Sequence, residues 1–330
     1  MRIISILFLF FLFPSDNDKP VAPEQASSGP GGQEYLHNGV RFSDFAESAD
    51  GYWLFEPAQP LADSAQVIVF THGYGAYNPM IYGAWIKHLV RQGYIVIFPR
   101  YQKNLISPWP SSFFENTAQG IKAAYRELEE GQNRVRPTNQ PFIMVGHSYG
   151  GTIAAYLSVK HAEFDLPAPA GLMLCAPGTG PFRAGRLDSY EAMPSCTNLL
   201  MVINEEDNVV GQDFQYKIFE TAKYSERRNL LIQHPDDYGY PSISATHSEC
   251  YAVDLEFDTG TRTPSARRAL GMGDPGPLDY FGYWKLLDAL IDCVNTGDNC
   301  SYAFGATEQQ MHLGTWSDGQ EIRPFEVFTK

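Results

Sequence analysis

Short apolar runs alternate with helical patterns along most of this chain, and no other feature of the sequence restricts the fold as much. The runs are rich in Val, Ile, Leu and Phe, and several are apolar throughout, as strands covered on both faces would be. They are YWLFEP from residue 52, VIVFTHG from 67, IVIFPR from 95, FIMVGH from 142, GLMLCAP from 171, LLMVINEE from 199 and NLLIQH from 229.

Apolar residues at helical spacing occupy the stretches between these runs. They predict helices over 79–92, 113–130, 149–161 and 212–224, and a final amphipathic helix over 278–293. Strands that alternate with helices predict an α/β fold with a parallel sheet joined by right-handed crossovers. No repeat or linker interrupts the pattern after residue 32, so we expect a single α/β domain over residues 33–330, with a C-terminal extension from about residue 296.

The first 32 residues differ from the rest in composition. An apolar run from Ile3 to Phe13 follows Arg2, and a polar stretch rich in Gly and Pro continues to Gly32. The run is too short to cross a bilayer as a helix, but it suits the hydrophobic region of a secretory signal. We therefore expect residues 1–32 to be a signal peptide and a flexible segment. The mature protein would be secreted or periplasmic, with no stable membrane span.

The charge balance narrows the class of partner. Acidic residues outnumber basic ones by 38 to 24, which gives a formal net charge of −14. Such a chain repels phosphate backbones, so nucleic acid is not an expected partner. The histidines and acidic residues also lack metal-ligand spacings such as His-Glu-x-x-His, and we expect neither a metal nor a cofactor.

The five cysteines do not all pair in this interpretation. Cys293 and Cys300 flank a turn-rich stretch, DCVNTGDNC, that could close a short loop, and we expect a disulfide between them. Cys175 ends an apolar run and is expected to be a buried thiol. Cys196 precedes one predicted strand and Cys250 follows another, which places these two at opposite edges of parallel strands, too far apart to pair.

The stretch PFIMVGHSYGGTIAAYLSV, residues 141–159, carries the clearest chemical signal. A strand-like run ends in a Gly-x-Ser-x-Gly, and a helical pattern begins directly after it. Glycines on both sides allow the sharp strand-to-helix turn that exposes a serine hydroxyl. Ligands of open parallel sheets bind at the carboxyl ends of the strands. Ser148 is therefore the candidate nucleophile.

A serine nucleophile needs backbone donors for the oxyanion that forms when it attacks a carbonyl. The residue after the nucleophile supplies one N–H, here that of Tyr149. The loop THGYGAYNP, after the strand run from 67, can supply the second from Tyr74. The alternative interpretation of this loop is a glycine-rich turn with aromatic filler.

The candidate acid and base follow later strands. Glu205, Glu206 and Asp207 stand in a row after the run from 199, and Asp207 is favoured because it lies past the strand and before the next helix. Glu206 is the second choice. The base should follow the acid along the chain. The candidates are His234, His247 and His312, and the last lies in a tail beyond the final helix. The pattern of the residues leaves His234 and His247 open.

From THGYGAYNP through GHSYGG, EEDNVVG and DDYGYPSISATH, the chain resembles the α/β-hydrolase superfamily, in particular secreted bacterial serine esterases of the lipase, cutinase and dienelactone-hydrolase-like type. The resemblance covers about residues 50–295. It implies an α/β-hydrolase fold, with a mostly parallel central sheet and helices on both faces, and a triad of Ser148, Asp207 and His247. The cysteine pattern and the C-terminal segment depart from cutinases, which puts polymer substrates in doubt.

The expected activity is hydrolysis of a small or lipid-like carboxylic ester through an acyl-enzyme. A serine peptidase or amidase on the same fold, or a non-catalytic binding protein, are the alternatives. Aromatic residues in the loops after the predicted strands suggest an apolar substrate pocket, with Tyr77 and Trp109 as its candidate walls. The same rings could instead pack loops onto the sheet.

Overall fold

The computed structural model describes residues 19–328. The apolar run predicted to be the core of a signal peptide, Ile3–Phe13, lies outside the described residues. Within residues 19–328, no helix is both long enough and apolar enough to span a bilayer.

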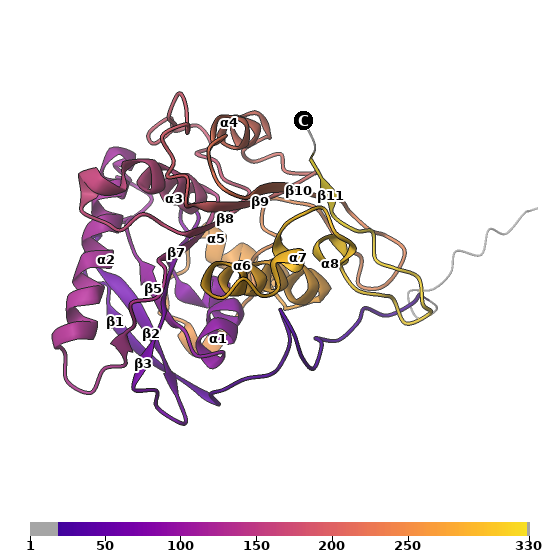
Figure 1. Cartoon of the computed structure of the whole chain (residues 1–330), viewed down its shortest axis with the longest axis horizontal. Coiled ribbons are helices and arrows are strands. Elements are labelled where there is room, and N and C mark those ends of the chain that lie inside the picture. The colour runs from indigo at the N-terminus through magenta and orange to yellow at the C-terminus, as the bar shows by residue number, and fades with distance from the viewer. Residues whose placement is uncertain (1–18, 329–330) are drawn as a thin grey trace, which may run out of the picture.

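A nine-stranded sheet forms the centre of the molecule, in the order β1-β2-β5-β4-β7-β8-β9-β10-β11 (Figure 1). The six strands from β5 to β10 in this order run parallel, and the others pair antiparallel with their neighbours. The parallel strands are β5 (Ile95–Pro99), β4 (Val67–Thr71), β7 (Ile143–His147), β8 (Gly171–Cys175), β9 (Asn198–Asn204) and β10 (Arg228–Gln233). The others are β1 (Gly39–Phe45), β2 (Tyr52–Ala58) and β11 (Glu326–Val327), while β3 (Ser64–Ala65) and β6 (Arg136–Pro137) pair separately.

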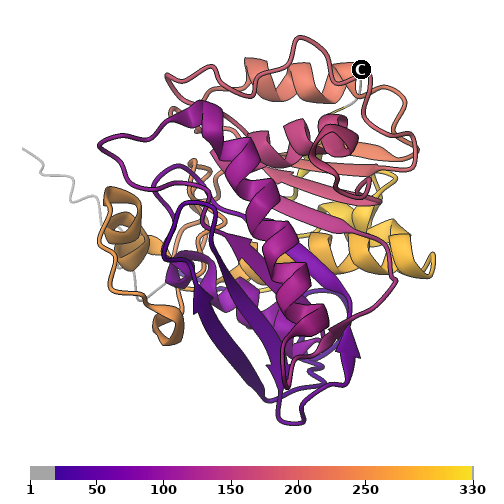
Figure 2. The same ribbon diagram turned by 90° about the vertical axis from the view of Figure 1, so that its left-hand side faces the viewer.

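Helices cover both faces of the sheet, so the predicted mostly parallel α/β architecture is confirmed (Figure 2). Alternate strand residues point to opposite faces, as Ile68 and Val69 of β4 do, and each joins a different apolar core. One core is shared with α1 (Gly83–Arg91) and α6 (Lys285–Asn295). The other is shared with α2 (Phe113–Glu130), α3 (Tyr149–Lys160) and α4 (Asp213–Thr221).

Several elements differ from the sequence prediction. The run from residue 52 is a strand, but it pairs antiparallel with β5, and β1 and β11 extend the two sides of the sheet. The final helix is regular only in α6, since Leu278–Trp284 forms a π-helical turn before it. Three short helices were not predicted, namely α5 (Pro264–Met272), α7 (Cys300–Ala303) and α8 (Glu308–Met311).

Residues 19–32 make hydrogen bonds to distant parts of the chain. The Val21 N–H donates to Ser317 Oγ at 3.0 Å, and the Gly31 N–H donates to the buried Asp288 carboxylate at 2.8 Å. Backbone bonds also join Pro20 and Ala22 to Tyr240. These partners satisfy backbone groups that a free segment would leave to water.

The C-terminal segment lies beside α6 and the sheet edge. The Lys285 side chain is 4% exposed, and its ammonium donates to three main-chain carbonyls in this segment, those of Gln309, Gln310 and His312, at 2.9, 3.1 and 2.6 Å. The predicted disulfide between Cys293 and Cys300 is present, with a Cα–Cα distance of 4.7 Å, and links α6 to α7.

The remaining cysteines are thiols. Cys175 is buried as predicted, and Cys250 is buried as well. Cys196 is exposed.

Candidate active site

Ser148 occupies a strained turn between β7 and α3. Its backbone angles are φ 55° and ψ −121°, in a region that a residue with a Cβ rarely adopts. The end of β4 passes so close that a Cβ at Gly150 would collide with the Thr71 carbonyl oxygen, and one at Gly146 would collide with the Thr71 side chain. The two glycines therefore allow the backbone contact that fixes the turn.

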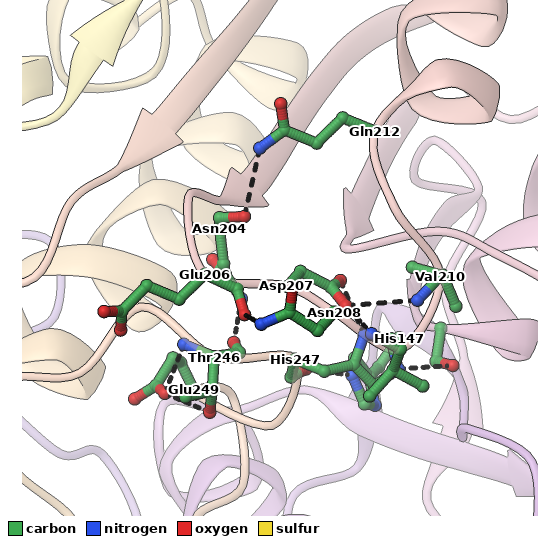
Figure 3. Close-up of polar contacts among 12 residues, drawn as sticks. His147, Asn204, Glu206, Asp207, Asn208, Val210, Gln212, Thr246, His247 and Glu249 are labelled. Carbon is green, nitrogen blue, oxygen red and sulfur yellow. Dashed lines mark hydrogen bonds and ion pairs between the residues drawn. The ribbon is translucent and has the colours of Figure 1, made fainter.

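The structure brings Ser148, His247 and Asp207 into one hydrogen-bonded line at the carboxyl ends of β7, β9 and β10. His247 Nε2 lies 2.8 Å from Ser148 Oγ. His247 Nδ1 lies 2.7 Å from Asp207 Oδ2 (Figure 3). All three residues are at most 7% exposed. The candidate nucleophile, the candidate base and the candidate acid are thus in contact.

Asp207 is held as a carboxylate. Its Oδ1 accepts hydrogen bonds from the backbone N–H groups of Val209 and Val210, at 2.9 and 3.2 Å. Burial acts to raise the pKa of Asp207, but the bond from His247 and these backbone donors outweigh it, and the pKa lies below its ordinary value. The ionised acid can therefore fix His247 with its proton on Nδ1 and its free lone pair toward Ser148.

The residues considered as alternative acids and bases contact other parts of the protein, not Ser148. His234 bonds to Glu205 at 2.8 Å and to Glu326 at 3.1 Å, at the outer side of the sheet. His312 is half-buried in the C-terminal segment, where its ring contacts Phe281. Glu206 instead accepts a hydrogen bond from the Ala245 N–H at 3.0 Å and so holds the loop that carries His247.

A second buried imidazole, that of His147, supports the same loop, and the sequence analysis did not single it out. His147 Nε2 lies 2.9 Å from the main-chain carbonyl oxygen of His247, so this nitrogen is the donor. His147 Nδ1 accepts from the Tyr82 hydroxyl at 2.8 Å, and that hydroxyl accepts from the Gly73 N–H at 3.0 Å. Burial lowers the pKa of His147 to about 3. The ring is therefore neutral, and it connects the loop of Gly73 to the loop of His247.

The two predicted oxyanion donors have no competing partner. Within residues 19–328, neither the Tyr74 N–H nor the Tyr149 N–H makes a hydrogen bond. The loop that carries Tyr74 lies against the serine, since a Cβ at Gly73 would be 3.2 Å from Ser148 Cβ. The Gly75 N–H donates to Gln102 Oε1 at 2.7 Å, and the Gly75 carbonyl oxygen accepts from Thr263 Oγ1 at 2.6 Å. A fixed loop with free N–H groups is the arrangement that stabilises a developing oxyanion.

A cavity of about 460 Å³ opens at Ser148 and His247. Its walls are largely apolar and include Tyr74 and Tyr149, the residues predicted to supply the oxyanion donors. Among the described residues, Tyr77 and Trp109 are not part of this lining, so the structure does not place the two predicted pocket walls there. Tyr77 is buried beside His72, and Trp109 is 72% exposed.

Other parts of the chain supply walls that the sequence analysis missed. They are the loop of residues 178–182, Val209 and Val210 beside the acid, and the segment after His247 that includes α5. Residues 178–182 follow β8 and Val209 and Val210 follow β9, so the rule on the carboxyl ends of strands covers both stretches but does not say which of their side chains face the cavity. The α5 segment lies about 30 residues beyond the end of β10, so this rule does not reach it. Among residues 19–328, no group of three or more His, Cys, Asp or Glu side chains could hold a metal ion.

The sheet order, the strained serine between strand and helix, and the Ser–His–Asp contacts define an α/β-hydrolase fold. A family model described as Chlorophyllase, an α/β-hydrolase-type family, matches residues 54–189. This match covers less than half of the chain. It includes Tyr74, Ser148 and Tyr149 and ends before Asp207 and His247. No curated protein matches the chain significantly.

Proposed function

We propose that the protein is a serine hydrolase that cleaves carboxylic esters through an acyl-enzyme. The observation that carries this proposal is the line of hydrogen bonds from Ser148 Oγ through His247 to Asp207, at 2.8 and 2.7 Å. The similarity over residues 54–189 to Chlorophyllase, a carboxylesterase-type hydrolase family, favours esters as the substrate class.

The geometry suits a two-step reaction. His247 Nε2 takes the Ser148 proton as Oγ attacks the ester carbonyl, and Asp207 stabilises the imidazolium that results. The N–H groups of Tyr74 and Tyr149 bind the oxyanion. His247 then gives its proton to the leaving alcohol, and the ester C–O bond breaks. Water, activated by His247, attacks the acyl-enzyme and releases the acid while Ser148 regains its proton.

An ester panel with site variants tests this proposal. Ser148→Ala and His247→Ala should each lower kcat by roughly 10⁴-fold or more, and Asp207→Asn by roughly 10³- to 10⁴-fold, because the line of hydrogen bonds acts as a unit. Wild type should bind a fluorophosphonate probe covalently, and Ser148→Ala should not.

His234→Ala is the control for the base. This histidine also bonds to a carboxylate, Glu205, but lies apart from Ser148, so activity should persist in the variant. Full activity in Ser148→Ala, or loss of activity in folded His234→Ala, would contradict the assignment. Cleavage of peptide anilides at rates similar to esters would favour a peptidase or amidase instead.

We also propose that the protein is exported and that residues 33–330 are one domain. The disulfide between Cys293 and Cys300 favours an oxidising compartment. Strands from β1 at residue 39 to β11 at residue 327 join one sheet, which favours a single folding unit. The proposal of export is tested by cell fractionation and N-terminal sequencing: the protein should be found in the periplasm or the medium, with residues near the N-terminus removed.

A further inference from the structure

The cavity at Ser148 is apolar except for one permanent charge. Its walls include Phe182, Val209 and Val210, together with the rings of Tyr74 and Tyr149. Of the described residues that line it, only Arg268, on α5, carries a permanent charge. A charged group in the wall of an otherwise apolar site typically orients the ligand and selects for its chemistry.

The Arg268 guanidinium has no protein partner. Its side chain is exposed, and it makes no hydrogen bond or ion pair with any residue between 19 and 328. Other arginines of the chain do pair with carboxylates, as Arg134 does with Glu56 at 2.8 Å and Arg262 with Asp258. Its donors therefore remain free at the cavity wall.

Glu249 is the carboxylate that Arg268 influences, but the two do not form an ion pair. Glu249 Oε1 accepts from Ser244 Oγ at 2.8 Å. It also accepts from the Thr246 N–H at 2.8 Å (Figure 3), and so Glu249 faces its own turn. Burial raises the pKa of Glu249, and the positive charge of Arg268 acts in the opposite direction. Arg268 thus lies near the loop that carries His247, but no group of this loop accepts a hydrogen bond from the Arg268 guanidinium.

The position of α5 is tied to the reacting centre. Thr263 Oγ1 donates to the Gly75 carbonyl at 2.6 Å, and Ser265 Oγ donates to the Tyr74 carbonyl at 3.2 Å. Asn78 Nδ2, next to the same loop, donates to Thr261 O at 3.1 Å. These bonds join the helix that carries Arg268 to the loop that carries an oxyanion donor. A group bound by Arg268 would therefore be held at a defined place relative to Ser148.

We propose that Arg268 binds a carboxylate of the substrate, so that the preferred substrate is an apolar ester that carries one carboxylate away from the scissile carbonyl. A guanidinium can donate two parallel hydrogen bonds to a carboxylate, and the donors of Arg268 are free at the cavity wall to do so. The chain as a whole has a net charge of −14 and repels anions in general, so a local cation at the cavity favours the entry of one. This inference rests on the proposed ester hydrolysis.

Matched ester pairs test the inference, because they differ in charge and little in shape. For a carboxylate on the acid side, the pair is methyl para-carboxybenzoate and methyl para-carbamoylbenzoate. For one on the leaving-group side, the pair is para-acetoxybenzoate and para-acetoxybenzamide. The measured quantity is the anionic-to-neutral ratio of kcat/KM within each pair, for wild type, Arg268→Gln, Arg268→Lys and Arg267→Gln.

Arg268→Gln should lower this ratio by about tenfold in at least one pair, since a charge-assisted bidentate contact is lost. Arg268→Lys should keep part of the preference, and added KCl should reduce it in wild type. Arg267→Gln is the matched control, because Arg267 is the exposed neighbour on α5 and is not among the residues lining the cavity; its ratio should equal that of wild type.

The outcomes separate this inference from the proposed function. If wild type hydrolyses the neutral esters in a Ser148-dependent way but Arg268→Gln keeps the wild-type ratio in both pairs, the carboxylate inference is wrong and ester hydrolysis stands. If wild type hydrolyses none of the four esters, both fail. A ratio that falls in one pair alone supports the inference and assigns the carboxylate to that side of the ester.

Discussion

The imidazole of His147 lies next to the nucleophile in the chain, but both of its nitrogen atoms are used to hold other residues. One nitrogen donates to the backbone of His247, and the other accepts from Tyr82, which in turn accepts from Gly73. The ring therefore holds the loops of the proposed base and of the proposed oxyanion donor, and both of its nitrogen atoms are already hydrogen-bonded. At the scale of single residues, two consequences can be measured.

The first concerns pH and stability. Burial lowers the pKa of His147 to about 3 in the folded protein, while an unfolded histidine has a pKa of about 6.5. Below pH 6.5 the unfolded chain binds a proton that the folded chain refuses until near pH 3, so the free energy of unfolding falls as pH drops through this range. At pH 5 this loss should be about 2 kcal/mol.

Urea unfolding at pH 8 and pH 5 measures this effect. In His147→Gln the difference between the two free energies of unfolding should be smaller than in wild type by about 2 kcal/mol. His312→Gln is the control, because that imidazole makes no hydrogen bond among the described residues. An unchanged difference in His147→Gln would mean that this ring does not carry the pH dependence.

The second concerns the Tyr82 hydroxyl. Tyr82→Phe leaves His147 Nδ1 and the Gly73 N–H buried without partners, which should lower the free energy of unfolding by about 1 to 3 kcal/mol. It should also lower kcat, because Gly73 precedes the oxyanion donor Tyr74. Tyr238→Phe removes a hydroxyl that is bound at the surface to Asp318, and both quantities should stay near wild type. Equal effects from the two variants would contradict this role.

At the scale of elements, α5 both walls the cavity and fixes the oxyanion loop. Thr263 caps this helix by accepting from the Ala266 N–H, and its hydroxyl donates to the Gly75 carbonyl. The sequence analysis had predicted neither the helix nor the contact. The segment from 253 to 273 has few apolar residues at helical spacing, and nothing in its composition indicates which loop it packs against.

Variants of two threonine N-caps distinguish an effect on stability from an effect on catalysis. Thr263→Val and Thr307→Val each remove a capping oxygen, from α5 and α8, and each should cost about 1 kcal/mol of stability. Only Thr263→Val should also lower kcat/KM, because it frees the Gly75 carbonyl beside the oxyanion loop. Steady-state kinetics with thermal unfolding compares them. A similar kcat/KM in both variants would show that the contact of Thr263 does not position the loop.

At the scale of the whole molecule, both ends of the described chain are fixed to the folded body. Lys285 is central, because its buried ammonium binds three carbonyls of the C-terminal segment. Burial lowers the pKa of Lys285 to about 7. Lys285→Met should lower the free energy of unfolding by about 1 to 3 kcal/mol at neutral pH, since three carbonyls lose their buried donor. Denaturant unfolding measures this loss. Lys217→Met, which removes a partly exposed lysine paired with Asp188, should have little effect.

Much of the fold could be predicted from the sequence because the central strands are buried on both faces and are therefore apolar throughout. The edge strands escaped prediction, since β1 mixes polar and apolar residues and β11 has only two residues. Chain order and position after strands indicated Ser148 and favoured Asp207, but they left His234 and His247 open as the base, and only the resemblance to the α/β-hydrolases selected His247. Whether a ring such as Tyr77 or Trp109 faces a cavity depends on loop packing, which no local pattern encodes.

The short strand β11 has a consequence for how copies of this protein meet. It pairs with Leu231 and Ile232 of β10, and Phe328 beyond it packs its ring against Tyr216 and Phe219 of α4. Without residues 326–328, the amide and carbonyl groups on this side of β10 would be bare and could pair with an edge of another molecule. Residues 326–328 thus cover the part of this edge at Leu231 and Ile232, where a second strand could otherwise pair.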